Sequence, residues 1–171
     1  MSQAPPPVPL PDPHLADGNL VLRPWAQADA TALAAAWADP DVARWTGVPE
    51  RCDHVAAGRW IAGEADRRAR GLALDLVIEV DGTVAGEIGL AALDPDRRTS
   101  EIGWWVGPAH RGRGLAASAA RLLADWALSE LFVDAVLARC HQDNPASGAV
   151  ARAAGFVRAG AVGELDLWRC C

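Results

Sequence analysis

The eleven residues from Val106 to Ala116 constrain the fold of this chain most, because they join three kinds of local structure. An apolar, aromatic run ends at Val106, a Gly-Pro pair follows, and two Arg residues then alternate with two Gly residues. Beyond Gly114 the apolar side chains recur at helical spacing, at Leu115, Ala119, Leu122 and Trp126. The pattern predicts a strand, a Gly/Arg loop over residues 107–114 and the first turn of a long amphipathic helix.

This junction has the character of an anion site. The first turn of a helix presents unpaired backbone N–H groups and the positive end of the helix dipole. Acidic residues commonly occupy such a turn, but none occurs between Glu101 and Asp125, and Arg111 and Arg113 stand at the entrance. We therefore expect a phosphate or pyrophosphate ligand here. The alternative is an ordinary helix start with solvated Arg side chains.

Two common phosphate motifs do not fit the loop. A P-loop requires Gly-Lys followed by Ser or Thr, and the chain has no Lys at all. A dinucleotide-binding fingerprint requires Gly-x-Gly-x-x-Gly and an acidic residue about 20 positions further on, and neither is present.

Composition sets the broad class of the chain. Its 171 residues predict one domain over residues 19–171, preceded by a Pro-rich arm over residues 1–18 that is disordered or extended. The net charge of −6 argues against a nucleic-acid partner and suits a cationic or neutral amine. Four scattered Cys and four His show neither a disulfide framework nor metal-ligand spacing. The cysteine pattern indicates a reducing compartment, and no apolar run is long enough for a membrane span, so we expect a cytoplasmic protein. The His spacing predicts no metal.

The order of the predicted elements indicates an α/β domain with one mixed sheet. We expect strands at 20–23, 72–80, 83–93, 100–106, 133–140, 156–159 and 164–169, and helices at 29–37, 53–70, 113–131 and 145–154. The order is β-α-α-β-β-β-α-β-α-β-β. A helical crossover between the strands at 100–106 and 133–140 makes those two strands parallel neighbours.

Four motifs in this order carry a family resemblance. They are Glu101-Ile-Gly-Trp-Trp105, the run from Pro108 to Ala116 that contains Arg-x-x-Gly-x-Ala, Asn144-Pro-Ala-Ser147, and Gly155-Phe156. The chain resembles the GNAT acyl-CoA N-acyltransferases from about Leu20 to its end, and most closely the branch of ribosomal-protein alanine acetyltransferases. The resemblance implies an acetyl-CoA-dependent N-acetyltransferase that passes the acetyl group directly from the thioester to a primary amine, on a protein N-terminus or a small molecule.

The resemblance also implies where the cosubstrate lies. The loop and helix start hold the coenzyme A pyrophosphate through Arg111, Gly112, Arg113, Gly114, Leu115 and Ala116. Backbone groups near Trp105 and Val106 receive the pantetheine arm and the acetyl oxygen, and Asn144 and Ser147 contact the pantetheine. The residues themselves offer a second interpretation of Asn144-Pro145, because Asn is a favoured N-cap and Pro suits the first position of a helix.

Two carboxylates compete for the role of general base. Glu101 is the first choice, acting directly or through a water, because histone-type members of the family carry their base ten residues before the position of Arg111. The alternative is a strand-end carboxylate paired with Arg97 or Arg98. Glu87 is the rival: if the turn at 94–99 pairs residue 93 with residue 100, Glu87 lies opposite Val106, beside the expected acetyl site. It interrupts the apolar run from Val84 to Ala92, so it is either functional or on a solvated face.

The acid step departs from the family pattern. Many members protonate the departing thiolate with a Tyr, and this chain has none, so Ser147 is the nearest replacement. The missing Tyr motivates an alternative function, a non-catalytic acyl-CoA-binding sensor or interaction module. Trp45 and Trp60 are candidate acceptor-binding residues, although Trp at helical spacing is more often part of a core. Exposed sheet edges make a homodimer plausible.

Overall fold

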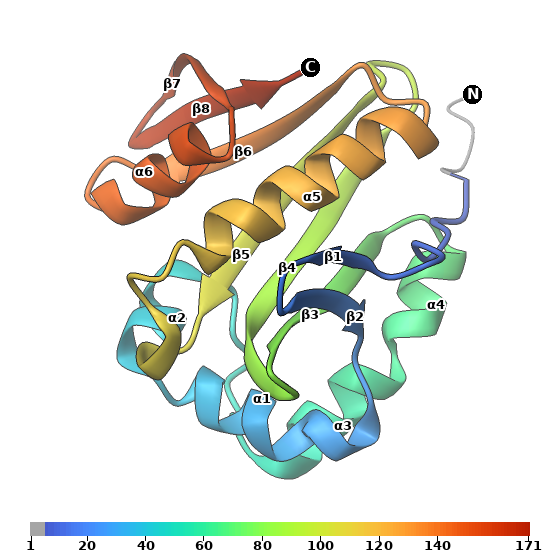
Figure 1. Cartoon of the computed structure of the whole chain (residues 1–171), viewed down its shortest axis with the longest axis vertical. Helices are drawn as coiled ribbons and strands as arrows, with labels where there is room; N and C mark the ends of the chain where they lie inside the picture. The colour runs from blue at the N-terminus through green and yellow to red at the C-terminus, as the bar shows by residue number, and fades with distance from the viewer. Residues whose placement is uncertain (1–5) are drawn as a thin grey trace.

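The computed structural model describes residues 6–171 and contains one mixed sheet with helices on both faces (Figure 1). The strands are β1 (Leu15–Asp17), β2 (Leu20–Pro24), β3 (Ala73–Val80), β4 (Thr83–Asp94), β5 (Thr99–Val106), β6 (Ala135–His141), β7 (Val157–Val162) and β8 (Leu165–Cys170). The helices are α1 (Ala30–Trp37), α2 (Pro40–Trp45), α3 (His54–Ala62), α4 (Glu64–Ala69), α5 (Leu115–Glu130) and α6 (Pro145–Ala153), with short 3-10 turns at Gln27–Asp29 and Pro108–His110. The predicted mixed α/β class is confirmed.

The strands lie in the order β1-β2-β3-β4-β5-β6-β8-β7. As predicted, β5 and β6 are parallel neighbours, while the other neighbouring pairs are antiparallel. Their pairing covers only Thr99–Glu101 against Ala135–Leu137. Beyond Glu101 the two strands separate, which leaves the rest of β5 free of a β6 partner on that edge.

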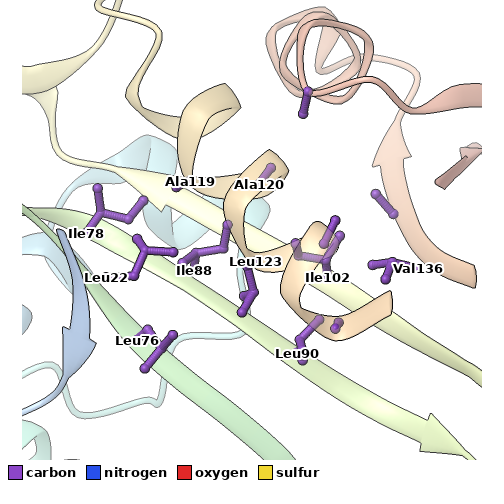
Figure 2. Close-up of a cluster of buried hydrophobic side chains, with 14 of the residues drawn as sticks. Leu22, Leu76, Ile78, Ile88, Leu90, Ile102, Ala119, Ala120, Leu123 and Val136 are labelled. Carbon is purple, nitrogen blue, oxygen red and sulfur yellow. The ribbon is translucent and has the colours of Figure 1, made fainter. Parts of the chain in front are cut away.

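The two faces of the sheet carry separate apolar clusters. On one face α5 packs Ala119, Ala120 and Leu123 against Leu76, Ile78, Ile88, Leu90 and Ile102 (Figure 2). On the other face α1, α2 and α3 cover Val77 and Trp105. Small Ala side chains bring α5 close to the strands, and alternate residues of each strand supply one cluster or the other.

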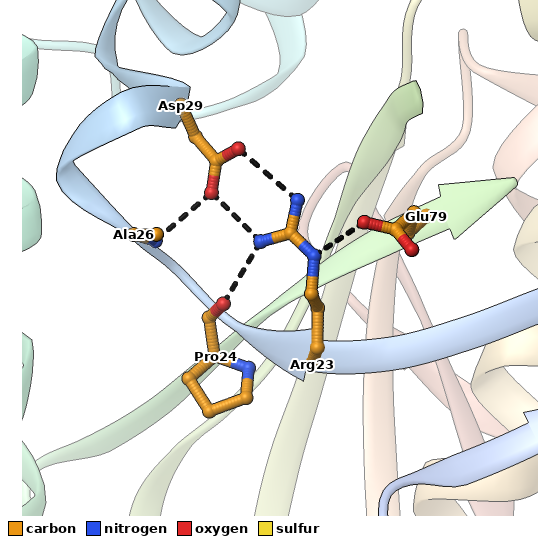
Figure 3. Close-up of polar contacts among 5 residues, drawn as sticks. All are labelled: Arg23, Pro24, Ala26, Asp29 and Glu79. Carbon is orange, nitrogen blue, oxygen red and sulfur yellow. Dashed lines mark hydrogen bonds and ion pairs between the residues drawn. The ribbon is translucent and has the colours of Figure 1, made fainter. Parts of the chain in front are cut away.

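An ion-pair network attaches α1 to the edge of this second cluster (Figure 3). Arg23 of β2 contacts Asp29 at 2.7 Å and also pairs with Glu79 of β3. Asp29 accepts a further hydrogen bond of 2.9 Å from the backbone N–H of Ala26. Burial alone would raise the pKa of Asp29, but the Arg23 and Ala26 contacts outweigh it and hold the pKa below its usual value.

Several element boundaries differ from the sequence prediction. The long helix expected over 53–70 is divided at Gly63 into α3 and α4, and α5 begins at Leu115 because Gly112 and Gly114 have positive φ. In the predicted arm, residues 1–5 lie outside the described residues. Within the rest, Leu15–Asp17 forms an edge strand against β2, and Val8 is buried in the apolar cluster beneath α5, so parts of the predicted arm belong to the folded domain.

The pairing of β4 with β5 corrects one prediction. Asp94 pairs with Thr99, consistent with the expected turn, but Ala91 pairs with Glu101, so two residues of β4 oppose one residue of β5. This β-bulge contains Ala92 at φ 48°. Glu87 therefore lies opposite Trp105 and not opposite Val106. Because the bulge shifts the register by one residue, the side chain of Glu87 lies on the opposite face of the sheet from the one predicted. This is the face of the second cluster, which contains its neighbours Val77 and Trp105.

Candidate active site

A cleft of about 780 Å³ opens at the point where β5 and β6 separate. Strands β3, β4 and β5 form its floor. The Gly/Arg loop with the first turn of α5, together with α2 and α6, forms its walls. It brings together the following predicted site residues: Trp45, Glu87, Trp105, Val106, Arg111, Gly112, Arg113, Gly114, Leu115, Ala116, Asn144 and Ser147. Glu101 and Trp60 are not among its lining residues.

The Gly/Arg loop, at one end of the cleft, has the backbone geometry of the anion site that the sequence predicts. Gly112 and Gly114 adopt left-handed conformations, at φ 72° and 74°, which most other residues adopt only with strain. Gly114 stands at the N-cap of α5 without a side-chain cap, and the first turn carries no acidic residue. The N–H groups of this turn are therefore available to an anion that the protein does not itself supply.

The two Arg residues of the loop have different partners. Arg111 donates to Asp39 at 2.6 Å, to Asp41 at 3.1 Å and to the carbonyl of Val106 at 3.0 Å. The Arg111 guanidinium thereby holds the pKa of Asp39 below its usual value. Arg113 is exposed and lies 3.3 Å from His110 Nδ1. Arg111 thus ties the loop to α2, whereas Arg113 presents its charge at the mouth of the cleft.

Glu87 lies on the floor of the cleft. Its Oε1 accepts a hydrogen bond of 3.2 Å from Trp105 Nε1, while its Oε2 is buried and has no hydrogen-bond partner among residues 6–171. Burial, followed by the like charge of Asp75, raises the pKa of Glu87 to about 8. A carboxyl group with that pKa exchanges its proton near neutral pH, which is the property required of a general base or acid.

Glu101 occupies a different environment. Its Oε1 pairs with Arg139 of β6 at 2.6 Å. Glu101 and Leu137 form the last residue pair before the strands separate, so Arg139 lies just beyond the paired stretch. The pairing expected with Arg97 or Arg98 does not form, because these residues contact Asp94 and Asp134 instead. Arg139 itself lines the cleft, so Glu101 reaches the cleft through its partner.

The start of α6 forms the wall opposite β5. The Asn144 side chain caps this helix by accepting from the N–H of Ser147 at 3.2 Å, and Pro145 occupies the first helical position. The capping interpretation is therefore confirmed. Both residues also line the cleft, so capping leaves their cosubstrate role open.

The two candidate acceptor-binding Trp residues lie apart. Trp45 lines the cleft from α2, with its ring 5.4 Å from that of His141 and a guanidinium of Arg44 over its face. Trp60 packs edge-on against Trp25 and Trp37 within the second apolar cluster, and Arg67 covers its face at 4.3 Å. The structure thus places Trp60 in the core, as the alternative interpretation expected.

The sequence interpretation missed Asp75 and Arg67. Asp75 of β3 lines the cleft, and its Oδ2 accepts from Arg67 Nε of α4 at 3.1 Å. One signal was available, because Asp75 interrupts an otherwise apolar strand, Ala73-Leu-Asp-Leu-Val-Ile78. An acidic residue in a buried strand requires a partner or a function.

Comparison with known proteins identifies the family. The GNAT acetyltransferase domain family matches residues 19–157. The chain belongs to the GNAT acetyltransferase family. It is therefore an N-acetyltransferase, and acetyl-CoA is its cosubstrate, as expected from the four motifs. The positive-φ glycines, the uncapped first turn of α5 and the open edge of β5 fit that cosubstrate.

Individual relatives agree with the expected branch of the GNAT family. The chain is 25% identical to an uncharacterized N-acetyltransferase, p20, of Bacillus licheniformis, over 86% of this chain and 84% of that protein. It is 26% identical to the ribosomal-protein-serine acetyltransferase of Escherichia coli, over 62% of this chain and 59% of that protein. The structure of Mycobacterium smegmatis RimJ in complex with CoA-disulfide shares the fold, with a TM-score of 0.81 and 22% identity over 88% of this chain and 81% of that one.

Two further findings concern residues 6–171. No group of three or more His, Cys, Asp or Glu side chains in this range could hold a metal ion. Nor does any helix in it combine the length and apolar character needed to span a bilayer.

Proposed function

We propose that this GNAT enzyme transfers the acetyl group directly from acetyl-CoA to a primary amine, on a protein N-terminus or a small molecule, without a covalent enzyme intermediate. The single observation that carries the proposal is the position of Glu87. This buried carboxyl group, whose Oε2 has no hydrogen-bond partner within residues 6–171, lies on the floor of the cleft. It belongs to β4, on the side of β5 opposite the edge that β6 leaves open.

The cosubstrate end is assigned from the loop. The N–H groups from Gly112 to Ala116 bind the pyrophosphate, and Arg113 adds a positive charge at the cleft mouth. Arg111 acts mainly by holding the loop against Asp39 and Asp41. Backbone groups near Trp105 and Val106 orient the pantetheine arm and polarise the thioester carbonyl. Asn144 supports the arm while capping α6.

We assign the base to Glu87 in preference to Glu101. An ammonium group must lose a proton before it can attack the thioester, and the acceptor of that proton needs a pKa near neutral. Burial of Glu87 supplies this property, whereas Glu101 is engaged with Arg139 at 2.6 Å. In this scheme Glu101 acts through Arg139, and it stays the second candidate for the base.

The departing thiolate requires a hydrogen-bond donor. The hydroxyl group of Ser147 is the donor that the α6 wall offers, in place of the Tyr that this chain lacks. A hydroxyl group of ordinary acidity stabilises the thiolate by hydrogen bonding or relays a proton from water. We therefore expect Ser147→Ala to slow the reaction less than loss of the base does.

The nature of the acceptor is supported by two observations. The relative named above as a ribosomal-protein-serine acetyltransferase acts on a ribosomal protein. In this chain Trp45 lines the cleft, and the part of its ring that Arg44 and His141 leave uncovered can contact an apolar part of the acceptor. A protein α-amine is accordingly the first acceptor to test, followed by amino acids, polyamines and other small amines.

The test follows the release of free thiol from acetyl-CoA with a panel of these amines, together with calorimetry of coenzyme A binding. We expect turnover with at least one primary amine and saturable coenzyme A binding. Coenzyme A binding without thiol release above background across the panel would favour a sensor module. Absence of both turnover and binding would overturn the proposal.

A further inference from the structure

Three neighbouring strands contribute a row of residues to the cleft floor beside Glu87. Asp75 of β3 pairs with Gly89 of β4, which in turn pairs with Gly103 of β5. Glu87 belongs to the next row, between Val77 and Trp105. Asp75 and Glu87 are therefore diagonal neighbours on one face, roughly 7–8 Å apart at their backbones. Both side chains line the cleft.

Asp75 is held in place by one oxygen. Its Oδ2 contacts Arg67 Nε and Nη2 at 3.1 Å, and Arg67 Nη1 donates to the carbonyl of Trp60 at 2.9 Å. The guanidinium also stacks on the Trp60 ring. Arg67 is thus fixed by three groups, and through its Oδ2 contacts Asp75 is fixed with it.

The glycines keep the floor between these groups free of side chains. A Cβ at Gly89 would lie 2.9 Å from the Leu74 carbonyl and 3.0 Å from Asp75 Oδ1, so only glycine allows this approach. A Cβ at Gly103 would meet nothing within 4 Å, and Gly103 is exposed. The space above Gly103 is therefore part of the open cleft, beside the free edge of β5.

Among the charged groups of this floor, Glu87 is the one carboxyl group that no cation pairs with within residues 6–171. Arg67 matches Asp75, and Arg139 matches Glu101. The other charged groups near Glu87 are Asp75, which opposes its ionisation, and Arg67, which favours it. Glu64 adds a weaker opposing influence on Asp75 and is itself paired with Arg68. An ammonium group with several N–H donors would complete the balance once Glu87 is ionised.

We propose that Asp75 and Glu87 together form a subsite for the acceptor's ammonium group, which is carried on an unbranched arm that crosses Gly103. Asp75 is then a specificity-determining residue for cationic primary amines, and Arg67 is the residue that positions it. The inference rests on the proposed function and adds the class of acceptor. Glu87 receives the amine proton, and Asp75 holds the cation beside it until that transfer.

The first test uses no turnover and so stands independently of the proposed function. The infrared carboxylic-acid band that wild type shows and Glu87→Gln lacks reports the protonation midpoint of Glu87. Asp75→Asn should lower that midpoint by at least about one pH unit, because a like charge is removed beside it. Millimolar n-butylammonium should lower the midpoint in wild type, whereas 1-butanol should not. A midpoint that is unchanged by Asp75→Asn or by n-butylammonium would overturn the proposal.

The second test uses an amine that the wild-type enzyme acetylates. Asp75→Asn should raise the KM for the amine roughly tenfold, the lower end of the range for hydrogen bonds to charged groups, and leave the KM for acetyl-CoA unchanged. Gly103→Leu should block branched amines more than unbranched ones. Asp134→Asn, which removes a carboxylate from an exposed pair with Arg98, is the matched control and should change neither constant. Equal amine KM values for Asp75→Asn and wild type would contradict the subsite while leaving the acetyltransferase activity intact.

Discussion

The indole nitrogen of Trp105 donates a hydrogen bond of 3.2 Å to Glu87, its cross-strand neighbour. The bond places Glu87 on the cleft floor beside β5, with its second carboxyl oxygen unpartnered within residues 6–171. It occupies one lone pair of the carboxyl group, and the buried Oε2 can still carry a proton. The role that we propose for Glu87 follows from this arrangement.

Replacement of the base should separate catalysis from binding. We expect Glu87→Gln to lower the rate of acetyl transfer on the order of 10²–10⁴-fold at neutral pH, the usual effect of losing a general base. Coenzyme A affinity, measured by calorimetry, should be unchanged. Glu101→Gln is the matched variant and should have the smaller effect on rate. If the two variants exchange these behaviours, Glu101 is the base and the original sequence interpretation was correct.

The same carboxyl group should reduce the stability of the fold at high pH. Its folded pKa of about 8 lies above the unfolded value of about 4.3, so the folded chain holds the proton more tightly. The contribution of protonated Glu87 to the unfolding free energy is complete below the unfolded pKa and is lost as the pH rises through 8. Denaturant titrations give the unfolding free energy of each protein. Between pH 5 and pH 9 the value for Glu87→Gln should rise relative to that of wild type by about 1 kcal/mol or more. A difference that stays constant over this range would show that Glu87 ionises normally.

The two loop arginines should act on coenzyme A binding in different ways. Arg113→Ala should weaken binding by about 1.5–3 kcal/mol, with a smaller effect at high salt. Arg111→Ala should act through the loop's attachment to α2, so Asp39→Asn should weaken binding in the same direction. Calorimetry of the three variants tests this. If Arg111→Ala weakens binding while Asp39→Asn has no effect, Arg111 contacts the phosphates itself.

The Arg23 network should support stability in a pH-dependent manner. At pH 7 we expect Asp29→Asn to cost about 1–2 kcal/mol of unfolding free energy, because the contacts of Arg23 and Ala26 with a partly buried carboxylate are weakened. The folded pKa of Asp29 is lowered, so this contribution is present above about pH 4 and is lost as the pH falls through the folded pKa. Asp17→Asn, in an exposed pair with Arg121, is the control and should cost less than about 1 kcal/mol. Equal losses for the two variants would contradict a special role for the network.

Local patterns predicted most of the architecture, although not the edge strand β1 or the division of the 53–70 helix. The Gly/Arg loop and the apolar spacing beyond Gly114 indicated a strand, a turn and a helix, and the crossover rule then made β5 and β6 parallel. Asn144-Pro145 predicted the start of α6 for the same reason, because capping depends on residues three positions apart.

The contacts that shape the site depend on distant residues, and the sequence did not reveal them. Ala92 adopts a left-handed conformation that its residue type does not suggest, and the bulge that contains it decides which face Glu87 occupies. Arg111 meets Asp39, which is 72 residues away in the chain. Asp75 meets Arg67 only because α4 packs on β3. Such pairings are set by tertiary packing and not by local spacing.

The dependence of kcat/KM on pH tests the central claim most directly, because it reports the ionisation of the free enzyme's essential base. The measurement requires an accepted amine whose own pKa lies well above that of Glu87. We predict that the wild-type profile bends near pH 8, that Glu101→Gln retains the bend and that Glu87→Gln loses it. A bend that persists in Glu87→Gln would contradict the account.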